Sequence, residues 1–88
     1  MASYSLRIKK SAQKEIRKLP SDYRSKVVQR IDALKHNPLP RSAEKIKGID
    51  NVYRFRQGIY RIIYSIDNNQ LIILVIKVSH RKDSYKHL

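Results

Sequence analysis

The order of apolar and polar residues along the chain predicts one strand, two helices and three further strands. In residues 3–8, Tyr4, Leu6 and Ile8 alternate with polar residues, which is the pattern of a strand buried on one side. The last apolar run, residues 71–76, is continuous and of strand length, which favours a strand in the middle of a sheet. The prediction is an α+β fold in which a roughly four-stranded sheet carries both helices on one face.

Two amphipathic helices are predicted between the first strand and the later ones. The first has apolar residues three and four positions apart, begins with Ser11 as its cap and ends at Pro20. The second begins with Ser21 as its cap and ends at residues 36–38. Its apolar residues form one stripe along the helix: Tyr23, Val27, Ile31 and Leu34. Because only a short connection separates the helices, we expect an antiparallel pair that covers a sheet.

Residues 52–64 read as two alternating strands joined by a two-residue turn at residues 57–58. With this turn, Arg54 lies directly opposite Arg61, and Arg56 lies on the same face. Like charges opposite each other destabilise a sheet by roughly 0.2–1 kcal/mol, so this face is expected to hold an anion. A solvated strand face with dispersed arginines is the alternative. The other face is apolar and is expected to join the core: Tyr53, Phe55, Tyr60, Ile62 and Tyr64.

The segments on either side of this hairpin are predicted to be a connection and a turn. Residues 39–50 contain Pro40 and Gly48 and show no clear period, so they read as a connection. Residues 67–70 are a turn signal, with 68–69 as the loop. The apolar residues that then continue the arginine face form a patch that we expect a partner to cover: Ile63, Ile72, Leu74 and Ile76.

Length and composition favour a single small domain that spans residues 1–88. The chain has no cysteine, and its three histidines lack the spacing of metal ligands, so we expect neither a metal nor another cofactor. Nowhere do eighteen apolar residues follow one another, which argues against a signal peptide and a membrane span. The expected location is the cytoplasm.

The net charge is the feature of the composition that says most about the partners of the protein. Twenty Lys and Arg residues against seven Asp and Glu residues give a formal net charge of +13. The bases are spread along the whole chain, so the folded surface itself should be positive. Such a field favours nucleic acid as a partner, although an acidic protein fits as well.

A candidate site combines the hairpin arginines with the C-terminal tail, residues 79–88, which is short enough to fold back beside them. Arginine offers a rigid bidentate fork for phosphate and keeps its proton at neutral pH, so it can clamp a phosphate but is a poor base. Tyr85 or His80 could transfer the proton, and RNA supplies its own nucleophile in the 2′-hydroxyl. The candidate catalytic residues are Arg54, Arg56, Arg61, His80, Arg81 and Tyr85.

The chain resembles the RelE/ParE superfamily of toxins from toxin–antitoxin systems, and within it the RelE-type mRNA interferases. The resemblance is carried by motifs in the same order: AQKEIRKL at 12–19, KIKG at 45–48, YRFR at 53–56, GIYRIIY at 58–64, VSHR at 78–81, and Tyr85. It implies a compact ribonuclease fold, cleavage of mRNA in the ribosomal A site, and neutralisation by a cognate antitoxin that wraps the toxin.

The resemblance also implies a role for each matching residue. Arg54 and Arg56 match basic strand residues that position the substrate, and Arg61 matches an arginine that stabilises the transition state. Arg81 matches an arginine that binds phosphate and supports the leaving group, and Tyr85 matches a tyrosine that stacks and assists attack. His80 falls at a position that is basic in related toxins.

Further residues are expected to contact partners. Lys45 and Lys47, on either side of the apolar Ile46, and Lys82 in the tail are expected to bind RNA or the ribosome. The apolar residues of the arginine face are expected to contact an acidic, amphipathic antitoxin. We expect the toxin to be a monomer on its own and to form a hetero-oligomer with its antitoxin.

Two other functions remain open. A ParE-type toxin shares the expected fold but poisons DNA gyrase without being a nuclease. A non-catalytic RNA- or DNA-binding module would account for the net charge but not for the convergence of the arginines.

Overall fold

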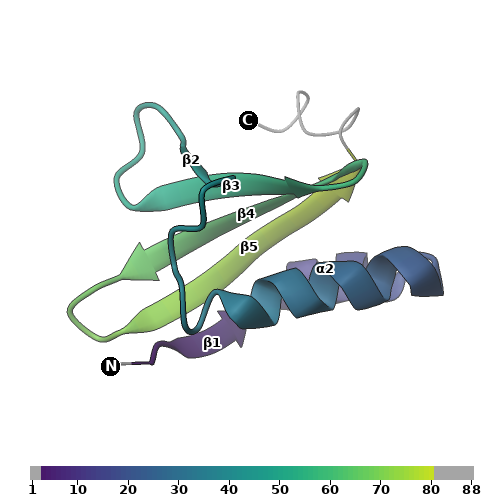
Figure 1. The fold of residues 1–88 in the computed structure, drawn as a ribbon, viewed down its shortest axis with the longest axis horizontal. Coiled ribbons are helices and arrows are strands. Elements are labelled where there is room, and N and C mark those ends of the chain that lie inside the picture. The colour runs from purple at the N-terminus through teal and green to yellow at the C-terminus, as the bar shows by residue number, and fades with distance from the viewer. Residues whose placement is uncertain (1–2, 81–88) are drawn as a thin grey trace.

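The computed structural model describes residues 3–80, which form a five-stranded sheet with two helices beneath one of its faces (Figure 1). The strand order across the sheet is β1-β5-β4-β3-β2. The predicted α+β class is confirmed, and β2 is a short edge strand inside the segment that was predicted to be a connection. The elements are β1 (Ser5–Ile8), α1 (Lys10–Arg17), α2 (Ser21–Ala33), β2 (Glu44–Lys45), β3 (Val52–Gln57), β4 (Tyr60–Asp67) and β5 (Ile72–His80).

The first and last strands lie side by side. β1 pairs with β5 in parallel, with Ser5 opposite Ile72 and Ile8 opposite Val75, whereas the other neighbours are antiparallel. β5 is therefore an inner strand of the sheet, flanked by β1 and β4. One of its faces is buried in the core through Ile73, Val75 and Val78, whereas Ile72 and Leu74 on the other face are half-buried. The two helices run in opposite directions below the sheet and leave its upper face open (Figure 1).

The turn between β3 and β4 differs from the prediction by one residue. Gln57 pairs with Tyr60, so the loop is Gly58-Ile59, and Gly58 has the positive φ of 62° that a two-residue hairpin loop requires at its first position. Arg56 is therefore the residue opposite Arg61. Moving the loop by one residue changes each cross-strand partner by two, and because side chains alternate with a period of two, every residue keeps its predicted face.

The loop between β4 and β5 is longer than predicted. Asp67 pairs with Ile72, so residues 68–71 form the loop, and the side chain of Asp67 accepts hydrogen bonds from the backbone N–H groups of Asn69 and Gln70 at 2.9 and 3.0 Å. Further along, the pairing shifts between Ile63 and Tyr64, and this bulge leaves Ile76 without a cross-strand partner in the register.

Both helices begin earlier than predicted, α1 by two residues and α2 by one. The residues at their N-cap positions are Lys9 and Pro20, and neither makes a side-chain capping hydrogen bond within the described residues. Ser11 and Ser21 lie inside the first turns and are not the caps. Proline fits before α2 because its fixed φ suits a helix start and its missing N–H would have no helical partner.

The core lies between the helices and the lower face of the sheet. The predicted apolar face of the hairpin is confirmed, since Phe55, Ile62 and Tyr64 are at most 2% exposed. The hydroxyl of Tyr64 donates a hydrogen bond to the carbonyl of Pro38 at 2.6 Å, and burial raises the pKa of Tyr64 to about 12. Tyr23, predicted on the apolar stripe of α2, is 40% exposed. Neither helix of residues 3–80 is long and apolar enough to cross a membrane.

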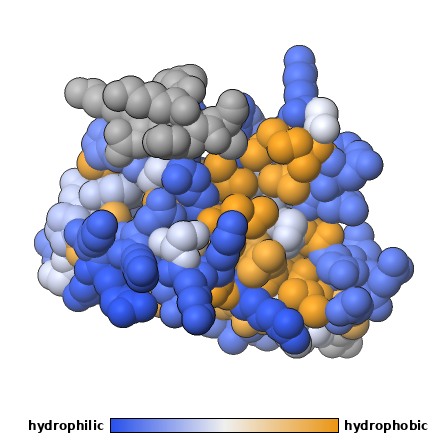
Figure 2. Space-filling model, turned by 180° about the vertical axis from the view of Figure 1, so that it is seen from behind, coloured by the Kyte–Doolittle hydropathy of each residue, from blue (hydrophilic) through white to orange (hydrophobic). Residues whose placement is uncertain are grey.

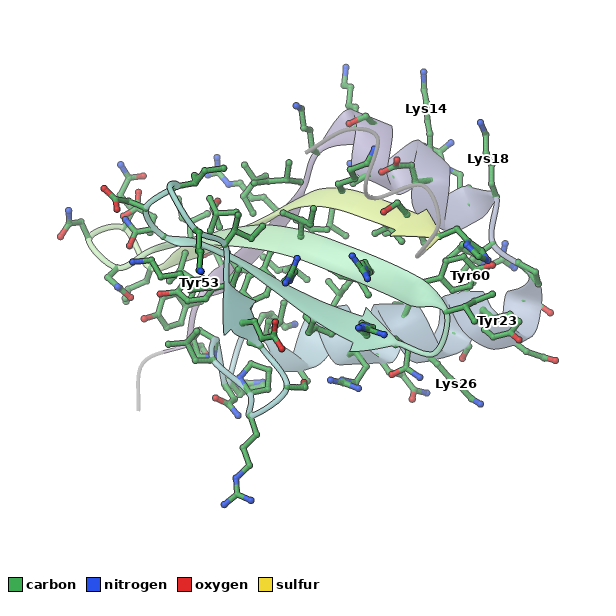
Figure 3. All side chains as sticks on the ribbon, turned by 90° about the horizontal axis from the view of Figure 1, so that it is seen from above. Lys14, Lys18, Tyr23, Lys26, Tyr53 and Tyr60 are labelled. Atoms are coloured by element: carbon green, nitrogen blue, oxygen red, sulfur yellow. The ribbon has the colours of Figure 1, made fainter. Side chains whose placement is uncertain are left out.

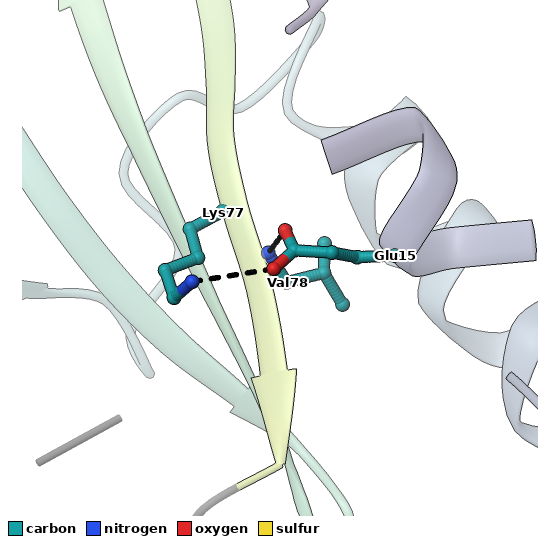
Figure 4. Close-up of polar contacts among 3 residues, drawn as sticks. All are labelled: Glu15, Lys77 and Val78. Carbon is teal, nitrogen blue, oxygen red and sulfur yellow. Dashed lines mark hydrogen bonds and ion pairs between the residues drawn. The ribbon is translucent and has the colours of Figure 1, made fainter. Parts of the chain in front are cut away.

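A carboxylate from α1 closes the edge of the sheet where β1 ends. Among the described residues, no strand continues beside β5 after Val75, so the next outward backbone groups need another partner. Glu15 fills this place (Figure 4): it accepts a hydrogen bond from the backbone N–H of Val78 at 2.9 Å and lies 3.2 Å from the ammonium group of Lys77. This contact ties α1 to the second half of β5.

We predict that Glu15→Ala destabilises the protein by about 1–3 kcal/mol, because the half-buried N–H of Val78 loses its charged acceptor. Glu15→Gln keeps an acceptor oxygen and should cost less. The measurement is the free energy of unfolding in urea. The control is Asp32→Asn, whose exposed ion pair with Lys35 should contribute less than about 0.5 kcal/mol. Equal effects of the Ala and Gln variants would show that the acceptor is not what stabilises this edge.

Candidate functional site

The open face of the sheet gathers three arginines around one pocket (Figure 3 looks onto this face). Arg56 of β3 lies directly opposite Arg61 of β4, and Arg54 lies two residues along β3 on the same face. The predicted sharing of one surface by these three residues is confirmed. The pocket has a volume of about 180 Å³ and is lined by Ser42, Glu44, Arg54, Phe55, Arg56 and Arg61.

The three arginines differ in exposure. Arg61 is only 8% exposed because β4 lies inside the sheet, whereas the side chain of Arg54 is 41% exposed and Arg56 is on the surface. A charge held away from water acts more strongly on a bound anion than an exposed one. The pocket therefore combines one fixed, buried cation with two cations that can adjust to a ligand, which suits the recognition of a phosphate group.

Glu44 is the functional candidate that sequence reasoning missed. It lies on β2 opposite Arg54, and its carboxylate is 3.3 Å from the guanidinium group of that residue. It is the single carboxylate among the described residues that line the pocket. Glu44 gave no clear signal in the sequence, because residues 39–50 hold three basic and two acidic residues, show no strand period and were read as a connection.

Arg30 of α2 contacts two of the residues that line the pocket, Ser42 and Phe55. Its guanidinium group donates to the hydroxyl of Ser42 and to the side-chain oxygen of Gln57, both at 2.9 Å, and lies 5.0 Å from the ring centre of Phe55. These contacts connect α2 with the loop before β2 and with the end of β3. No group of three His, Asp or Glu side chains within residues 3–80 is arranged to hold a metal ion.

His80 does not lie with the arginines. It is the last residue of β5 rather than part of a separate tail, and it pairs with Tyr60 on the side of the sheet that faces the helices, with the two ring centres 5.9 Å apart. Arg61 and Ser79, one residue along each strand, face the opposite side, as alternation requires. The predicted tail residues Arg81, Lys82 and Tyr85 lie outside the described residues.

The two lysines expected to contact RNA do not line the pocket. Lys45 and Lys47 are exposed, and Ile46 between them is half-buried. Lys45 pairs with Tyr53, which places it on the opposite side of the sheet from Glu44. Lys45 therefore lies on the other side of the sheet from the pocket, and neither lysine is among the residues that line it.

The apolar residues that continue the arginine face are less exposed than predicted. Ile63 is only 4% exposed because β4 is flanked by strands on both sides, so it offers little area to a partner. Ile72, Leu74 and Ile76 on β5 are half-buried. Figure 2, which views the molecule from behind, shows apolar residues gathered in a patch with hydrophilic residues on both sides of it.

Comparison with known proteins gives one consistent result. A family model described as the ParE toxin of the type II toxin–antitoxin system parDE matches residues 6–85. A protein of Methanocaldococcus jannaschii that is named toxin RelE1 is 33% identical over 87 residues, which are 96% of this chain and 97% of that protein.

Solved structures agree with this match. The archaeal RelE–RelB complex from Pyrococcus horikoshii OT3 has a TM-score of 0.81 at 30% identity, covering 90% of this chain and 96% of that chain. The toxin–antitoxin complex RelBE2 from Mycobacterium tuberculosis has a TM-score of 0.79 at 27% identity, covering 91% and 100%. Since the family model spans nearly the whole chain and the relatives match it end to end, the chain belongs to the RelE/ParE family of toxins of type II toxin–antitoxin systems.

Proposed function

We propose that this toxin is a ribosome-dependent endoribonuclease that cleaves mRNA in the ribosomal A site and so inhibits translation in the cytoplasm. The observation that carries the proposal is the convergence of Arg54, Arg56 and Arg61 with Glu44 around one pocket. Guanidinium groups fixed on paired strands suit a phosphodiester whose negative charge increases during the reaction. The relatives carry the name RelE, which supports the RelE-type assignment on which this proposal rests.

In the proposed reaction, the 2′-hydroxyl of one nucleotide attacks the adjacent phosphorus while a base removes its proton. The bond from phosphorus to the 5′-oxygen then breaks, and that oxygen takes up a proton. The products end in a 2′,3′-cyclic phosphate and a 5′-hydroxyl. Arg61, the buried cation, stabilises the phosphorane, and the more exposed Arg54 and Arg56 hold the flanking phosphate oxygens.

The proton must be removed by a group other than an arginine, since guanidinium groups stay protonated at neutral pH. Glu44 is the carboxylate among the described residues that line the pocket, and it lies 3.3 Å from the guanidinium group of Arg54, so we assign it as the general base. Arg81 and Tyr85 keep their predicted roles in phosphate binding and stacking. Tyr85 is the alternative base, because His80 faces the helices.

A gyrase poison is the second candidate, and the description of the matching family model as a ParE toxin favours it. Both kinds of toxin share one fold, so the fold does not separate them. The two functions differ in what the arginines do, because a gyrase poison needs no phosphodiester chemistry in the pocket.

We predict that Arg61→Ala lowers the rate of mRNA cleavage by about 10²–10³-fold, the usual effect of removing one donor that stabilises a transition state. The measurement is primer extension on mRNA in a purified translation system, with and without ribosomes. Because Arg61 is buried, Arg61→Lys is the second variant, which keeps the charge without the bidentate fork. The matched control is Arg7→Ala, an exposed arginine of β1. If wild-type protein leaves mRNA intact but inhibits gyrase supercoiling, the second candidate is correct.

We predict that Glu44→Gln lowers the rate of cleavage by about 10²–10⁴-fold, because the amide cannot accept the proton of the 2′-hydroxyl. The assay is the same, at saturating ribosomes, and mRNA binding should change little. Asp50→Asn, a nearby exposed acid, is the control. Full activity of Glu44→Gln would assign the base to the tail, where Tyr85→Phe then becomes the decisive variant.

We further propose that an acidic, amphipathic antitoxin neutralises this toxin. The solved relatives include toxins in complex with RelB antitoxins. The half-buried Ile72, Leu74 and Ile76 give such a segment an apolar surface on β5, and the neighbouring arginine pocket and the basic residues along the chain offer partners for its carboxylates. Binding there would cover the pocket and exclude RNA.

We predict that raising the salt concentration weakens antitoxin binding and slows association without abolishing it, because the contact combines apolar burial with charge. The measurement is a titration of binding against ionic strength with the cognate antitoxin. Leu74→Lys should weaken binding at all salt concentrations, whereas Val28→Lys, an exposed apolar position on α2, should not. Tight binding by a folded Leu74→Lys variant would place the antitoxin elsewhere.

A further inference from the structure

A second surface lies at the hairpin end of the sheet, where three aromatic rings from different elements meet. Tyr23 of α2 contacts Tyr60 of β4 edge to face, with ring centres 5.4 Å apart. Tyr60 contacts His80 of β5 in the same manner at 5.9 Å. We call Tyr23, Tyr60 and His80 the aromatic end. It lies on the helix side of the sheet and is separate from the arginine pocket, which opens on the other side.

Within the aromatic end, Tyr23 is the ring that remains open to solvent. It is 40% exposed, whereas Tyr60 is 9% exposed and supports it from below. The hairpin turn lies close to this ring, since a Cβ atom added at Gly58 would be 3.8 Å from Cε1 of Tyr23. A large aromatic ring that is fixed on one side and open on the other is suited to stacking, because little side-chain freedom is lost when a planar group lies on it.

Positive charge surrounds this ring. Figure 3 shows Tyr23 and Tyr60 together at one end of the molecule, with Lys14 and Lys18 extending on one side and Lys26 on the other. Residues 14–26 hold five Lys or Arg residues and two acids. Of these acids, Glu15 is engaged with β5. The net field around the open ring therefore attracts an anion.

A groove leads from the aromatic end along the uncovered edge of β5. Its volume is about 380 Å³, and Lys18, Tyr60 and His80 are among the residues that line it. Lys18 is exposed and close enough to line this groove, whereas the ammonium group of Lys77, at the same edge, is already paired with Glu15. Within the described residues, the surface thus offers the open ring of Tyr23 and, next to Tyr60 and His80, a groove that Lys18 lines.

We propose that the aromatic end binds single-stranded RNA, with one base stacked on Tyr23 and backbone phosphates contacting Lys18 and Lys26. This inference rests on the proposed function, because it takes RNA to be the polyanion that this surface binds. Tyr60 and Arg61 are consecutive and face opposite sides of the sheet, so both sites lie at the same end of the hairpin. An RNA strand that bends around the turn at Gly58 reaches both, and the aromatic end then holds a nucleotide that flanks the cleaved one. A ring among exposed charged residues suits a base better than an apolar protein segment.

The test measures the affinity of the full-length protein for a fluorescently labelled 2′-O-methyl oligoribonucleotide by anisotropy, without ribosomes. Tyr23→Ala should weaken binding about tenfold to a hundredfold, and Tyr23→Phe should stay within about twofold of the wild type, because stacking needs the ring and not the hydroxyl. Val28→Ala, at another exposed apolar position of α2, should bind as the wild type does. Lys18→Gln should reduce the slope of log affinity against log salt by about 0.7.

A duplex of the same sequence separates stacking from general attraction. Wild type and Tyr23→Ala should bind the duplex equally, since its bases are stacked on each other. If Tyr23→Ala binds the single strand as tightly as the wild type, or weakens only antitoxin binding, the inference is wrong. That outcome leaves the proposed nuclease intact if Arg61→Ala still abolishes cleavage. Conversely, a ring-dependent affinity in a protein that does not cleave mRNA would refute the nuclease and retain the RNA surface.

Discussion

The hairpin of β3 and β4 places two guanidinium groups directly opposite each other, Arg56 on one strand and Arg61 on the next. Such a pair opposes strand pairing, and it is held in place because the other face of the same strands is buried. Phe55, Ile62 and Tyr64 are at most 2% exposed and pack against the helices. The apolar face therefore fixes the positions of the arginines, and the pocket exists because the core does not allow the strands to slip.

The edges of the sheet determine what surrounds this hairpin. β1 covers β5 only as far as Val75, and Glu15 satisfies the next outward N–H group, at Val78. A longer first strand would close the edge beside Lys18 and Tyr60 and leave no groove there. At the opposite edge, the short β2 brings Glu44 beside Arg54. One end of the molecule thus carries an acidic group among arginines on one face and exposed aromatic and basic side chains on the other.

The relation between fold and function in this family is loose. The matching family model is described as ParE, whereas relatives similar in sequence and in structure carry the name RelE. The shared sheet and helices are common to both, so the chemistry depends on the few side chains that line the pocket. A buried cation, two exposed cations and one carboxylate form a set that suits phosphodiester cleavage, and their positions follow from the strands that carry them.

Local patterns along the chain were enough to predict the class of fold and the face of nearly every strand residue. Alternation has a period of two, so Arg54, Arg56 and Arg61 share a face for any two-residue loop in this turn. The pairing register, the order of the strands and the identity of the edge strands depend on contacts between distant segments, which local patterns do not show. The loop at Gly58 sets which arginines are opposite each other, and the pairing of β1 with β5 joins distant segments. β2 has only two residues and shows no period, so Glu44 was missed. His80 faces the helices because it is the last residue of β5 and follows the alternation of that strand. Local pattern reports which side a residue faces, whereas contacts between distant segments fix its neighbours.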